Sequence, residues 1–392
     1  MKKQTIAINT PFVRPDVYGA LAVPLYNNVA FEFNDAAEMA DAFCNRIKAP
    51  DYARVENPTV TNLEQRVKAL TGAEHVTAFN SGMAAISNTL LAVSGQHKNI
   101  VSSHHLFGNT LALLTTTLQR FGVEPRLCDL TRLDAVAAAI DENTCAVFLE
   151  VITNPQLEVA DLKSIAETAH QRGVPVIADS TVIPFTETSL RTLGVDVEVV
   201  SSTKYLSGGG TSLGGLVIDY GTHPCINQRL KYELLFNLGA YMTPQAAYMQ
   251  TLGLETLDVR YQRQAANALW LAQQLSEVSA IRRVNYLGLA DNPYNALARQ
   301  QFGNTAGAML TIDLPSKDAC FHFLNRLRLV HRATNLFDSR TLAIHPASTI
   351  FGNFTDEQLR KMDVHQTTIR LSIGLEDKED LLADIIQALG AS

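Results

Sequence analysis

Hydrophobic positions follow an alternating pattern through residues 61–250, where short apolar runs are separated by stretches of helical period. Leu63, Val67 and Leu70 recur at helical spacing before Gly72, which predicts a helix that ends at that glycine. Apolar runs of strand length lie at 76–79, 146–149, 174–178 and 195–200, and helical segments begin near 81 and 161. This order predicts an α/β domain with a mostly parallel sheet flanked by helices.

The pattern divides the chain into three regions. Residues 1–60 are punctuated by prolines and carry no regular period, which predicts an arm laid over another surface rather than an independent core. Residues 61–250 carry the alternating pattern and form the predicted α/β domain. In residues 251–392 the alternation weakens after a long helical stretch at about 261–275, and we expect a smaller α+β C-terminal domain there.

Composition restricts the class of protein further. The 392 residues are 46% hydrophobic with a formal net charge of −7, so a large core is expected and nucleic acid is not an expected partner. No apolar stretch approaches the ~18 residues that a membrane helix needs. The five cysteines are scattered and contain no C-x-x-C pair, which argues against a disulfide framework or a metal site. We therefore expect a soluble cytoplasmic protein that acts on small molecules.

Polar residues end three of the apolar runs. Glu150, Asp179 and the segment Ser201, Thr203 and Lys204 follow predicted strands, and open α/β sheets bind their ligands at the C-terminal ends of strands. The chain has no G-x-G-x-x-G between a strand and a helix, no Gly-Lys pair of a phosphate-binding loop and no H-E-x-x-H. The absence of these motifs argues against a dinucleotide-binding site, a nucleoside-triphosphate-binding site and a zinc-protease site.

The remaining polar residues suit a different cofactor. A lysine amine such as that of Lys204 can form a Schiff base with a carbonyl if its pKa is lowered. Hydroxyls at Ser201 and Thr203, with N–H groups at a helix start near Gly82, suit a phosphate, and a carboxylate at Asp179 can keep a pyridine nitrogen protonated. Each residue alone is more often a solvated lysine, a helix cap or a turn former. Together they are the groups that pyridoxal 5'-phosphate requires.

Ordered motifs extend this reading over almost the whole chain. They are Val23-Pro24-Leu25-Tyr26, Tyr52-Ala53-Arg54, Asn57-Pro58-Thr59, Ser81-Gly82-Met83-Ala84-Ala85, Asn154-Pro155, Asp179-Ser180-Thr181, Ser201-Ser202-Thr203-Lys204-Tyr205, His345-Pro346-Ala347-Ser348-Thr349 and Arg370-Leu371-Ser372-Ile373-Gly374-Leu375-Glu376. With these motifs the chain resembles the Cys/Met-metabolism family of pyridoxal-phosphate enzymes, the cystathionine γ-synthase-like group of fold-type I. The resemblance implies a large cofactor domain, a smaller C-terminal domain and a small amino-acid substrate.

The resemblance also implies roles for single residues. Lys204 would be the Schiff-base lysine and later the proton shuttle, Asp179 would pair with the pyridinium nitrogen, and Phe107 would stack on the cofactor ring. The other expected cofactor-binding residues of the same subunit are Ser81, Gly82, Met83, Thr181, Ser201 and Thr203. Metal ligands are not expected.

Two further sets of residues are implied in the same way. Tyr52 and Arg54 would reach the phosphate of a neighbouring subunit, so the active site would be shared within a homo-oligomer, with a tetramer expected. Arg370 would bind the substrate α-carboxylate as a two-pronged fork, with Asn154 and Asn335 as further substrate-binding residues.

Departures from the family pattern bear on the reaction. Position 107 is usually Tyr in this family, and Phe107 can stack but cannot donate a proton, which favours an ester whose carboxylate leaves readily. The residues Asn335, Asp338 and Arg340 are similar to those of O-acetylhomoserine sulfhydrylases. We therefore expect γ-replacement on an O-acylhomoserine with sulfide or a small thiol. The alternatives are a γ-lyase acting on methionine or homocysteine, a cystathionine γ-synthase and, from another class, a cofactor-binding regulatory protein without turnover.

Overall fold

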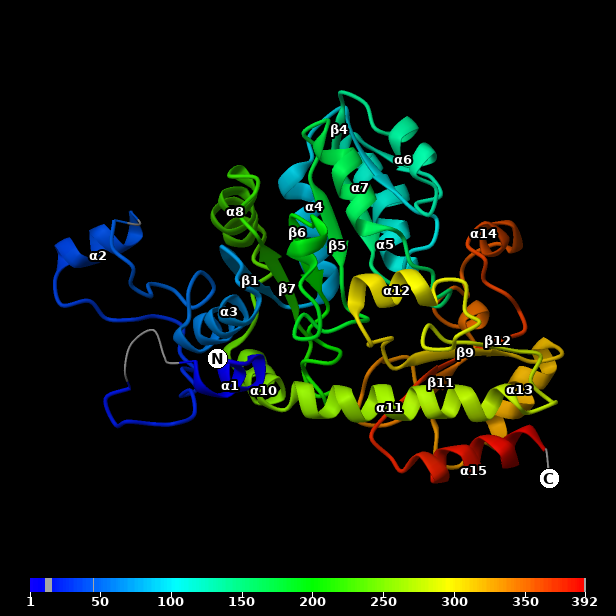
Figure 1. Ribbon diagram of the computed structural model, residues 1–392. Helices are drawn as coiled ribbons and strands as arrows, with labels where there is room; N and C mark the ends of the chain where they lie inside the picture. The colour runs from blue at the N-terminus through cyan, green and yellow to red at the C-terminus, as the bar shows by residue number, and fades with distance from the viewer. Residues whose placement is uncertain (11–15, 45, 391–392) are drawn as a thin grey trace.

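The computed structural model describes residues 1–10, 16–44 and 46–390, and these residues form a seven-stranded sheet and a five-stranded sheet with helices around them (Figure 1). Residues 11–15 and 45 of the predicted arm, and residues 391–392 of the predicted C-terminal domain, lie outside the described residues. The described part of the chain contains no helix with the length and apolar character that a membrane crossing requires.

The larger sheet has the predicted, mostly parallel arrangement. Its strands are β1 (His75–Phe79), β2 (Lys98–Ser102), β3 (Val123–Leu127), β4 (Thr144–Glu150), β5 (Val176–Asp179), β6 (Val197–Val200) and β7 (Gly215–Asp219), in the order β1-β7-β6-β5-β4-β2-β3. The pairs among β2 to β6 are parallel, whereas β7 is antiparallel to both β6 and β1. The reversal of β7 follows from its connection, because residues 201–214 contain no crossover helix to return the chain to the other edge.

Helices cover both faces of this sheet and form two hydrophobic cores. The helices of this half of the chain are α3 (Pro58–Thr71), α4 (Gly82–Val93), α5 (Gly108–Ala112), α6 (Leu133–Ala139), α7 (Leu162–His170), α8 (Cys225–Asn227), α9 (Phe236–Leu238) and α10 (Pro244–Glu255). Short π or 3-10 segments are η1 (Leu113–Thr117), η2 (Leu118–Phe121), η3 (Leu190–Leu193) and η4 (Gln228–Leu235).

Helix α3 illustrates how local sequence sets these elements. The Asn57 side chain accepts a hydrogen bond from the Thr59 N–H, and Pro58 occupies the first turn, both favourable at a helix start. Gly72 ends the helix with φ +67°, a left-handed conformation that glycine adopts without steric cost. The prediction of a helix ending at Gly72 is confirmed.

The smaller sheet lies in the C-terminal part of the chain. Its strands are β8 (Arg283–Asn285), β9 (Met309–Asp313), β10 (His331–Arg332), β11 (Leu342–Ile344) and β12 (Thr368–Ser372), in the order β10-β11-β12-β9-β8. The accompanying helices are α11 (Leu257–Ser276), α12 (Asn295–Phe302), α13 (Lys317–Arg326), η5 (Pro346–Ser348), α14 (Asp356–Lys361) and α15 (Lys378–Leu389). Helix α10 packs on α3 and α11 packs on the smaller sheet, so the chain passes from one sheet to the other between them (Figure 1).

The N-terminal region is partly folded onto its own chain. Helix α1 (Lys3–Asn9) is held by Arg66, whose Nη1 donates to the Ala7 carbonyl at 2.6 Å, and by Gln4, whose Nε2 donates to the Glu255 carbonyl at 2.8 Å. Helix α2 (Ala36–Phe43) instead projects away from both sheets (Figure 1). The region thus combines a docked first helix with an extended remainder.

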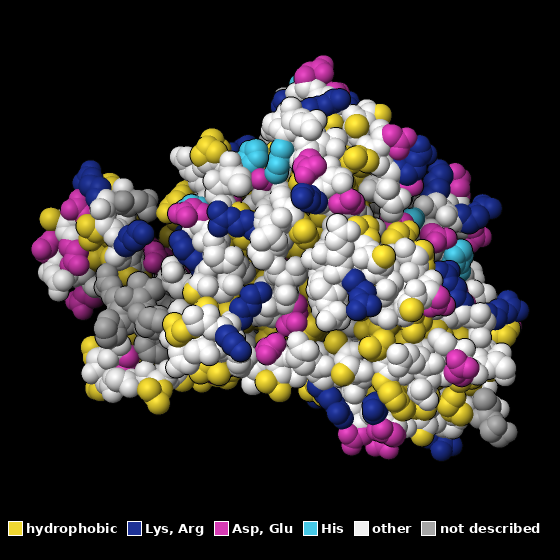
Figure 2. Space-filling model, viewed as in Figure 1, with side chains coloured by type: hydrophobic (Ala, Val, Ile, Leu, Met, Phe, Trp, Pro, Cys, Tyr) yellow, Lys and Arg dark blue, Asp and Glu magenta, His cyan; other side chains and the backbone are white. Residues whose placement is uncertain are grey.

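Charged side chains are mixed over the face shown in Figure 2, where basic and acidic groups alternate without a large patch of one sign. Apolar side chains are instead prominent in the N-terminal region. Val17, Tyr18 and Leu21 are 89%, 94% and 98% exposed. Such exposed apolar groups in one segment are typical of a surface that contacts another protein.

Candidate functional site

Lys204 lies in the turn that follows β6, at the C-terminal edge of the larger sheet. Its Nζ donates a hydrogen bond to Asn335 Oδ1 at 2.9 Å. Burial, reinforced by the positive charge of Arg370, lowers the pKa of Lys204 to about 8. The side chain lines a cavity of about 920 Å³ between the loop that follows β6 and residues 327–342. A lysine whose pKa is lowered in this way has the neutral amine that attack on a carbonyl requires.

Asp179 ends β5, the strand beside β6, as the sequence pattern predicts. The Thr181 N–H donates to Asp179 Oδ1 at 2.9 Å, and Thr181 Oγ1 accepts from the Ser201 N–H at 2.8 Å. Thr181 therefore ties Asp179 to Ser201. Burial raises the pKa of Asp179, and a protonated ring nitrogen beside it would favour the charged carboxylate.

Glu150 ends the next strand, β4, directly opposite Asp179 in the sheet register. Its Oε1 accepts from the Phe107 N–H at 2.6 Å. Burial, reinforced by the neighbouring Asp179, raises the pKa of Glu150 to about 8, which favours its neutral form at pH 7. Its position at a strand end is apparent from the sequence, but its contact with Phe107 is not.

The start of α4 provides a site for an anion. Ser81 is the N-cap residue. Its Oγ accepts a hydrogen bond from the Ala84 N–H at 3.1 Å, and its carbonyl accepts one from the Ala85 N–H at 3.0 Å. The N–H groups of Gly82 and Met83 have no partner within the helix, as in any first turn. These donors and the helix dipole favour a phosphate.

The same helix start packs very closely on the turn before Lys204. A Cβ atom added to Gly82 would lie 2.6 Å from Ser201 Cβ, so glycine is required for this approach. Thr203, two residues further along the same turn, accepts through its Oγ1 from the Gly214 N–H at 2.9 Å. The structure therefore brings Ser81 and Gly82 against Ser201, and this arrangement fits the phosphate of the expected cofactor.

Arg370 lies on β12 in the smaller sheet and is buried. Its Nη1 donates to Asn154 Oδ1 at 3.1 Å and its Nη2 donates to the Thr334 carbonyl at 3.2 Å. Among the described residues its buried Nε has no hydrogen-bond partner. Burial lowers the pKa of Arg370 to about 9, which leaves it cationic at neutral pH. A carboxylate would supply the missing acceptor, since it binds guanidinium groups through two oxygens.

Tyr52 and Arg54 lie elsewhere in the single chain. Arg54 Nη1 donates to the Phe236 carbonyl, and its guanidinium carbon lies 5.5 Å from the centre of the Tyr52 ring. Tyr52 is 43% exposed. The structure thus groups these two residues with each other and with α9, and it does not test their predicted contact with a neighbouring subunit.

Glu198, a buried acidic residue of β6, was not predicted as a notable residue from the sequence. Glu198, in the middle of β6, is buried and accepts hydrogen bonds from the Ser180 hydroxyl and, at 2.8 Å, from the Tyr220 hydroxyl. Burial raises the pKa of Glu198 to about 7. A lone acidic residue within an apolar strand is the signal that could have indicated it.

Comparison with known proteins agrees with this geometry. The family model described as "Cys/Met metabolism PLP-dependent enzyme" matches residues 4–390. The chain is 32% identical to O-acetyl-L-homoserine sulfhydrylase of Corynebacterium glutamicum, over 93% of the chain and 91% of that protein. It is 36% identical to L-methionine gamma-lyase of Fusobacterium nucleatum subsp. nucleatum, over 99% of each.

A solved structure is similar over the full length. It is a putative O-acetylhomoserine (thiol)-lyase from Campylobacter jejuni, with a TM-score of 0.96, 33% sequence identity and complete coverage of both chains. That protein carries N'-pyridoxyl-lysine-5'-monophosphate.

Proposed function

Since this chain belongs to the family of Cys/Met metabolism PLP-dependent enzymes, we propose that it catalyses γ-replacement on O-acetyl-L-homoserine or another O-acylhomoserine. Sulfide or a small thiol would be the nucleophile, and homocysteine or methionine the product. Its cofactor is pyridoxal 5'-phosphate and its architecture is that of fold-type I.

Pyridoxal phosphate, when bound, supplies an aldehyde for an amine and a ring that stores the electrons of broken bonds. Lys204 holds that aldehyde and afterwards moves protons between the substrate carbons, since its lowered pKa leaves part of the amine neutral near pH 8. Asp179 would hold the ring nitrogen in its protonated form, and Phe107 would stack on the ring. Met83 and the residues grouped at the start of α4 bind the phosphate.

The residues that position the substrate include Arg370, which belongs to the smaller sheet. Arg370 binds its α-carboxylate through the donor that is buried without a partner, and Asn154 fixes the orientation of the guanidinium. Binding at this point leaves the γ-substituent to extend into the cavity that Lys204 and Asn335 line. The cavity is large enough for the ester group and an incoming thiol.

The observation that carries the choice of reaction is the phenylalanine at position 107. Its backbone N–H is held by Glu150, so the ring belongs to a defined turn at the start of α5, but it offers no hydroxyl to protonate a leaving group. A thiolate is expelled more readily with such an acid, whereas a carboxylate leaves without one. An acyl ester is therefore the substrate that this site suits.

A γ-lyase is the second candidate, and the identity to a methionine γ-lyase favours it. A direct comparison separates the two functions. Purified holoenzyme is incubated with O-acetylhomoserine and sulfide, and in parallel with methionine alone. We expect homocysteine from the first mixture and little 2-oxobutanoate from the second. Rapid 2-oxobutanoate formation from methionine, with no homocysteine from the ester, would establish the lyase instead.

We further propose that the enzyme is a cytoplasmic homotetramer built from dimers. The proposal is supported by the exposed apolar residues of the N-terminal region and by the position of Tyr52 and Arg54 away from Lys204 in the single chain. In a dimer these two residues would complete the phosphate site of the neighbouring subunit.

A further inference from the structure

We propose that residues 335–340 form a positioning clamp for Lys204, in which Asp338 orients the Asn335 amide and Asn335 holds the lysine amine. This inference rests on the proposed function only in taking Lys204 as the reactive amine. It concerns a segment of the smaller-sheet region that crosses to the turn after β6. Asp338 would act as a positioning residue, without touching the substrate.

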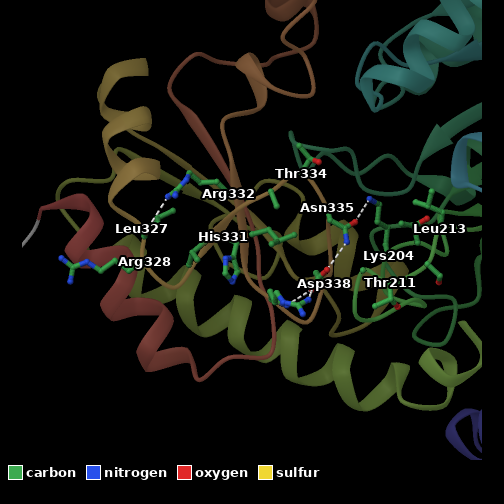
Figure 3. Close-up of a pocket in the computed structure, with 17 residues that line it drawn as sticks. Lys204, Thr211, Leu213, Leu327, Arg328, His331, Arg332, Thr334, Asn335 and Asp338 are labelled. Atoms are coloured by element: carbon green, nitrogen blue, oxygen red, sulfur yellow. Dashed lines mark hydrogen bonds and ion pairs between the residues drawn. The ribbon is translucent and has the colours of Figure 1, made fainter. Parts of the chain in front are cut away.

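The first link is a chain of hydrogen bonds. Lys204 Nζ donates to Asn335 Oδ1 at 2.9 Å, and Asn335 Nδ2 donates to Asp338 Oδ2 at 3.3 Å (Figure 3). An amide side chain has one accepting end and one donating end. A carboxylate only accepts, so Asp338 takes the NH₂ end of Asn335 and leaves the oxygen to face Lys204. Without Asp338, either end of the amide could face the lysine.

Asp338 is itself held firmly. Its Oδ1 accepts from the Arg340 backbone N–H at 3.1 Å and from Arg340 Nη1 at 3.0 Å. The residue is buried, and a Cβ atom added to Gly210 would lie 2.3 Å from Asp338 Oδ2. The loop after Lys204 therefore lies directly against this carboxylate, and glycine at position 210 permits the contact.

A second set of contacts joins the same two segments. The Phe337 ring is stacked on the Tyr205 ring, with centres 3.9 Å apart and planes at 7°, and Ser339 Oγ donates to the Gly208 carbonyl at 2.6 Å. Phe337 has φ +55°, a left-handed conformation that is unfavourable for a non-glycine residue. The buried aromatic stack offsets that cost and fixes the segment beside Lys204.

The choice of an amide as the direct partner of Lys204 has a chemical consequence. An amide oxygen accepts from a neutral or a protonated amine, whereas a carboxylate at the same place would hold the amine as a cation. Asp338 does not contact Lys204 directly but lies behind Asn335 in the chain of hydrogen bonds. Arg340 pairs with Asp338 and neutralises its charge. The clamp can therefore fix the amine after each release from the cofactor without suppressing its basicity.

The test compares Asp338→Asn with Asp377→Asn in the holoenzyme. Asp377 also pairs with an arginine, Arg263 at 2.8 Å, but on an exposed surface, so it controls for loss of one charge. The first readout needs no substrate: the visible absorbance of the Lys204-bound cofactor is titrated with pH. Asp338→Asn removes the negative charge that pairs with Arg340, whose positive charge then stands uncompensated in the cavity that Lys204 also lines. We therefore expect the apparent pKa of the Lys204-bound cofactor to fall by about one unit. We also expect kcat to fall by about tenfold or more, with KM within about twofold.

A double variant separates orientation from charge. Asp338→Asn combined with Arg340→Gln removes both charges, so the spectroscopic pKa should return towards that of the wild type while kcat stays low. Recovery of kcat in the double variant would overturn the orienting role of Asp338. An unchanged titration and a kcat within about twofold in Asp338→Asn, with normal melting, would overturn the clamp. Because the titration uses no substrate, a failure to form homocysteine would count against the proposed reaction only.

Discussion

Glu150 and Asp179 show how two neighbouring carboxyl groups take different roles. They end adjacent strands at matching register positions, and two buried like charges at this spacing destabilise each other. Glu150 relieves the conflict by keeping its proton, because its raised pKa of about 8 leaves it neutral at pH 7. It remains able to accept the Phe107 N–H. A neutral Glu150 adds no negative charge beside Asp179, the group that would face the ring nitrogen in the proposed function.

Phe107→Tyr tests whether a missing hydroxyl selects the leaving group. A phenol at this position would supply a proton donor, and general acids contribute ~10²-fold or more to such steps. We expect elimination from methionine to rise by about tenfold or more, while turnover of O-acetylhomoserine changes by less than about threefold. The measurement is kcat/KM for both substrates.

Phe107→Leu is the matched control, because it removes the aromatic ring without adding a donor. It should lower kcat/KM for both substrates through weaker packing on the cofactor. If Phe107→Tyr left thiolate-releasing substrates no better than before, the leaving-group argument would fail.

Local sequence patterns predicted where several candidate residues lie, because strand ends and helix starts carry local signals. The positions of Asp179, Lys204 and Gly82 at such points are confirmed, while their roles toward the cofactor stay predictions. Asn335 was expected beside the substrate, and the structure shows it bonded to Lys204. That contact joins residues 131 positions apart, and no local pattern reports a pairing between two regions so distant in the chain.

Local sequence patterns also predict the positions of strands and helices better than the way in which these elements pack together. The run at 146–149 was predicted as a strand and is confirmed within β4, and the run at 174–178 is confirmed for residues 176–178, which belong to β5. The reversal of β7 was not predicted, because strand direction depends on the connecting loop rather than on the apolar run itself. The docking of α1 on α3 was also not predicted, since proline content indicates an arm but not the surface that receives it.

The junction of α4 with the turn after β6 is an element-scale feature that can be tested directly. Gly82→Ala would place a Cβ atom 2.6 Å from Ser201 Cβ, so the helix start must move away from Ser201. We expect the dissociation constant for pyridoxal phosphate to rise by about tenfold or more, equivalent to ~1.4 kcal/mol. Gly95→Ala is the control, because its Cβ would have only Lys98 Cγ nearby, at 3.9 Å. Equal cofactor affinity in both variants would contradict this account of the phosphate site.

The pairing of β5, β6 and β7 around Glu198 predicts a dependence of stability on pH. Burial raises the pKa of Glu198 from 4.5 to about 7, so between these values the native state keeps a proton that the unfolded state releases. Its contribution is therefore complete below pH 4.5 and is lost as the pH rises towards 7. This one group can change the free energy of unfolding by at most ~3 kcal/mol over that range.

Glu198→Gln removes the titration, so its melting temperature should vary less between pH 5 and pH 7 than that of the wild type. Glu142→Gln, at an exposed position, should reproduce the wild-type dependence. A Glu198→Gln profile parallel to the wild type would show that Glu198 is already ionised in the folded protein at pH 5.

At the scale of the whole molecule, the proposed dimer would complete a site that one chain holds only in part. Lys204 and Asp179 lie at the C-terminal ends of neighbouring strands and Lys204 is close enough to Arg370 to feel its charge, whereas Arg54 contacts Phe236 and Tyr52. The exposed apolar side chains of Val17, Tyr18 and Leu21 belong to the N-terminal region. A second copy that covers them would also bring Tyr52 and Arg54 to a neighbouring phosphate site.

Mixing two inactive variants tests this shared site. Lys204→Ala removes the reactive amine and Arg54→Ala removes the expected phosphate ligand, so each variant alone should be nearly inactive. In a mixed dimer one site contains both defects and the other contains neither. Because half of randomly formed dimers are mixed, co-refolded protein should regain about a quarter of wild-type activity per protomer. As the control, a chain carrying both substitutions is co-refolded with wild type; every mixed dimer then has one defect in each site, and only wild-type dimers remain active. If the co-refolded mixture of Lys204→Ala and Arg54→Ala were no more active than the two variants measured separately, Arg54 would serve its own subunit.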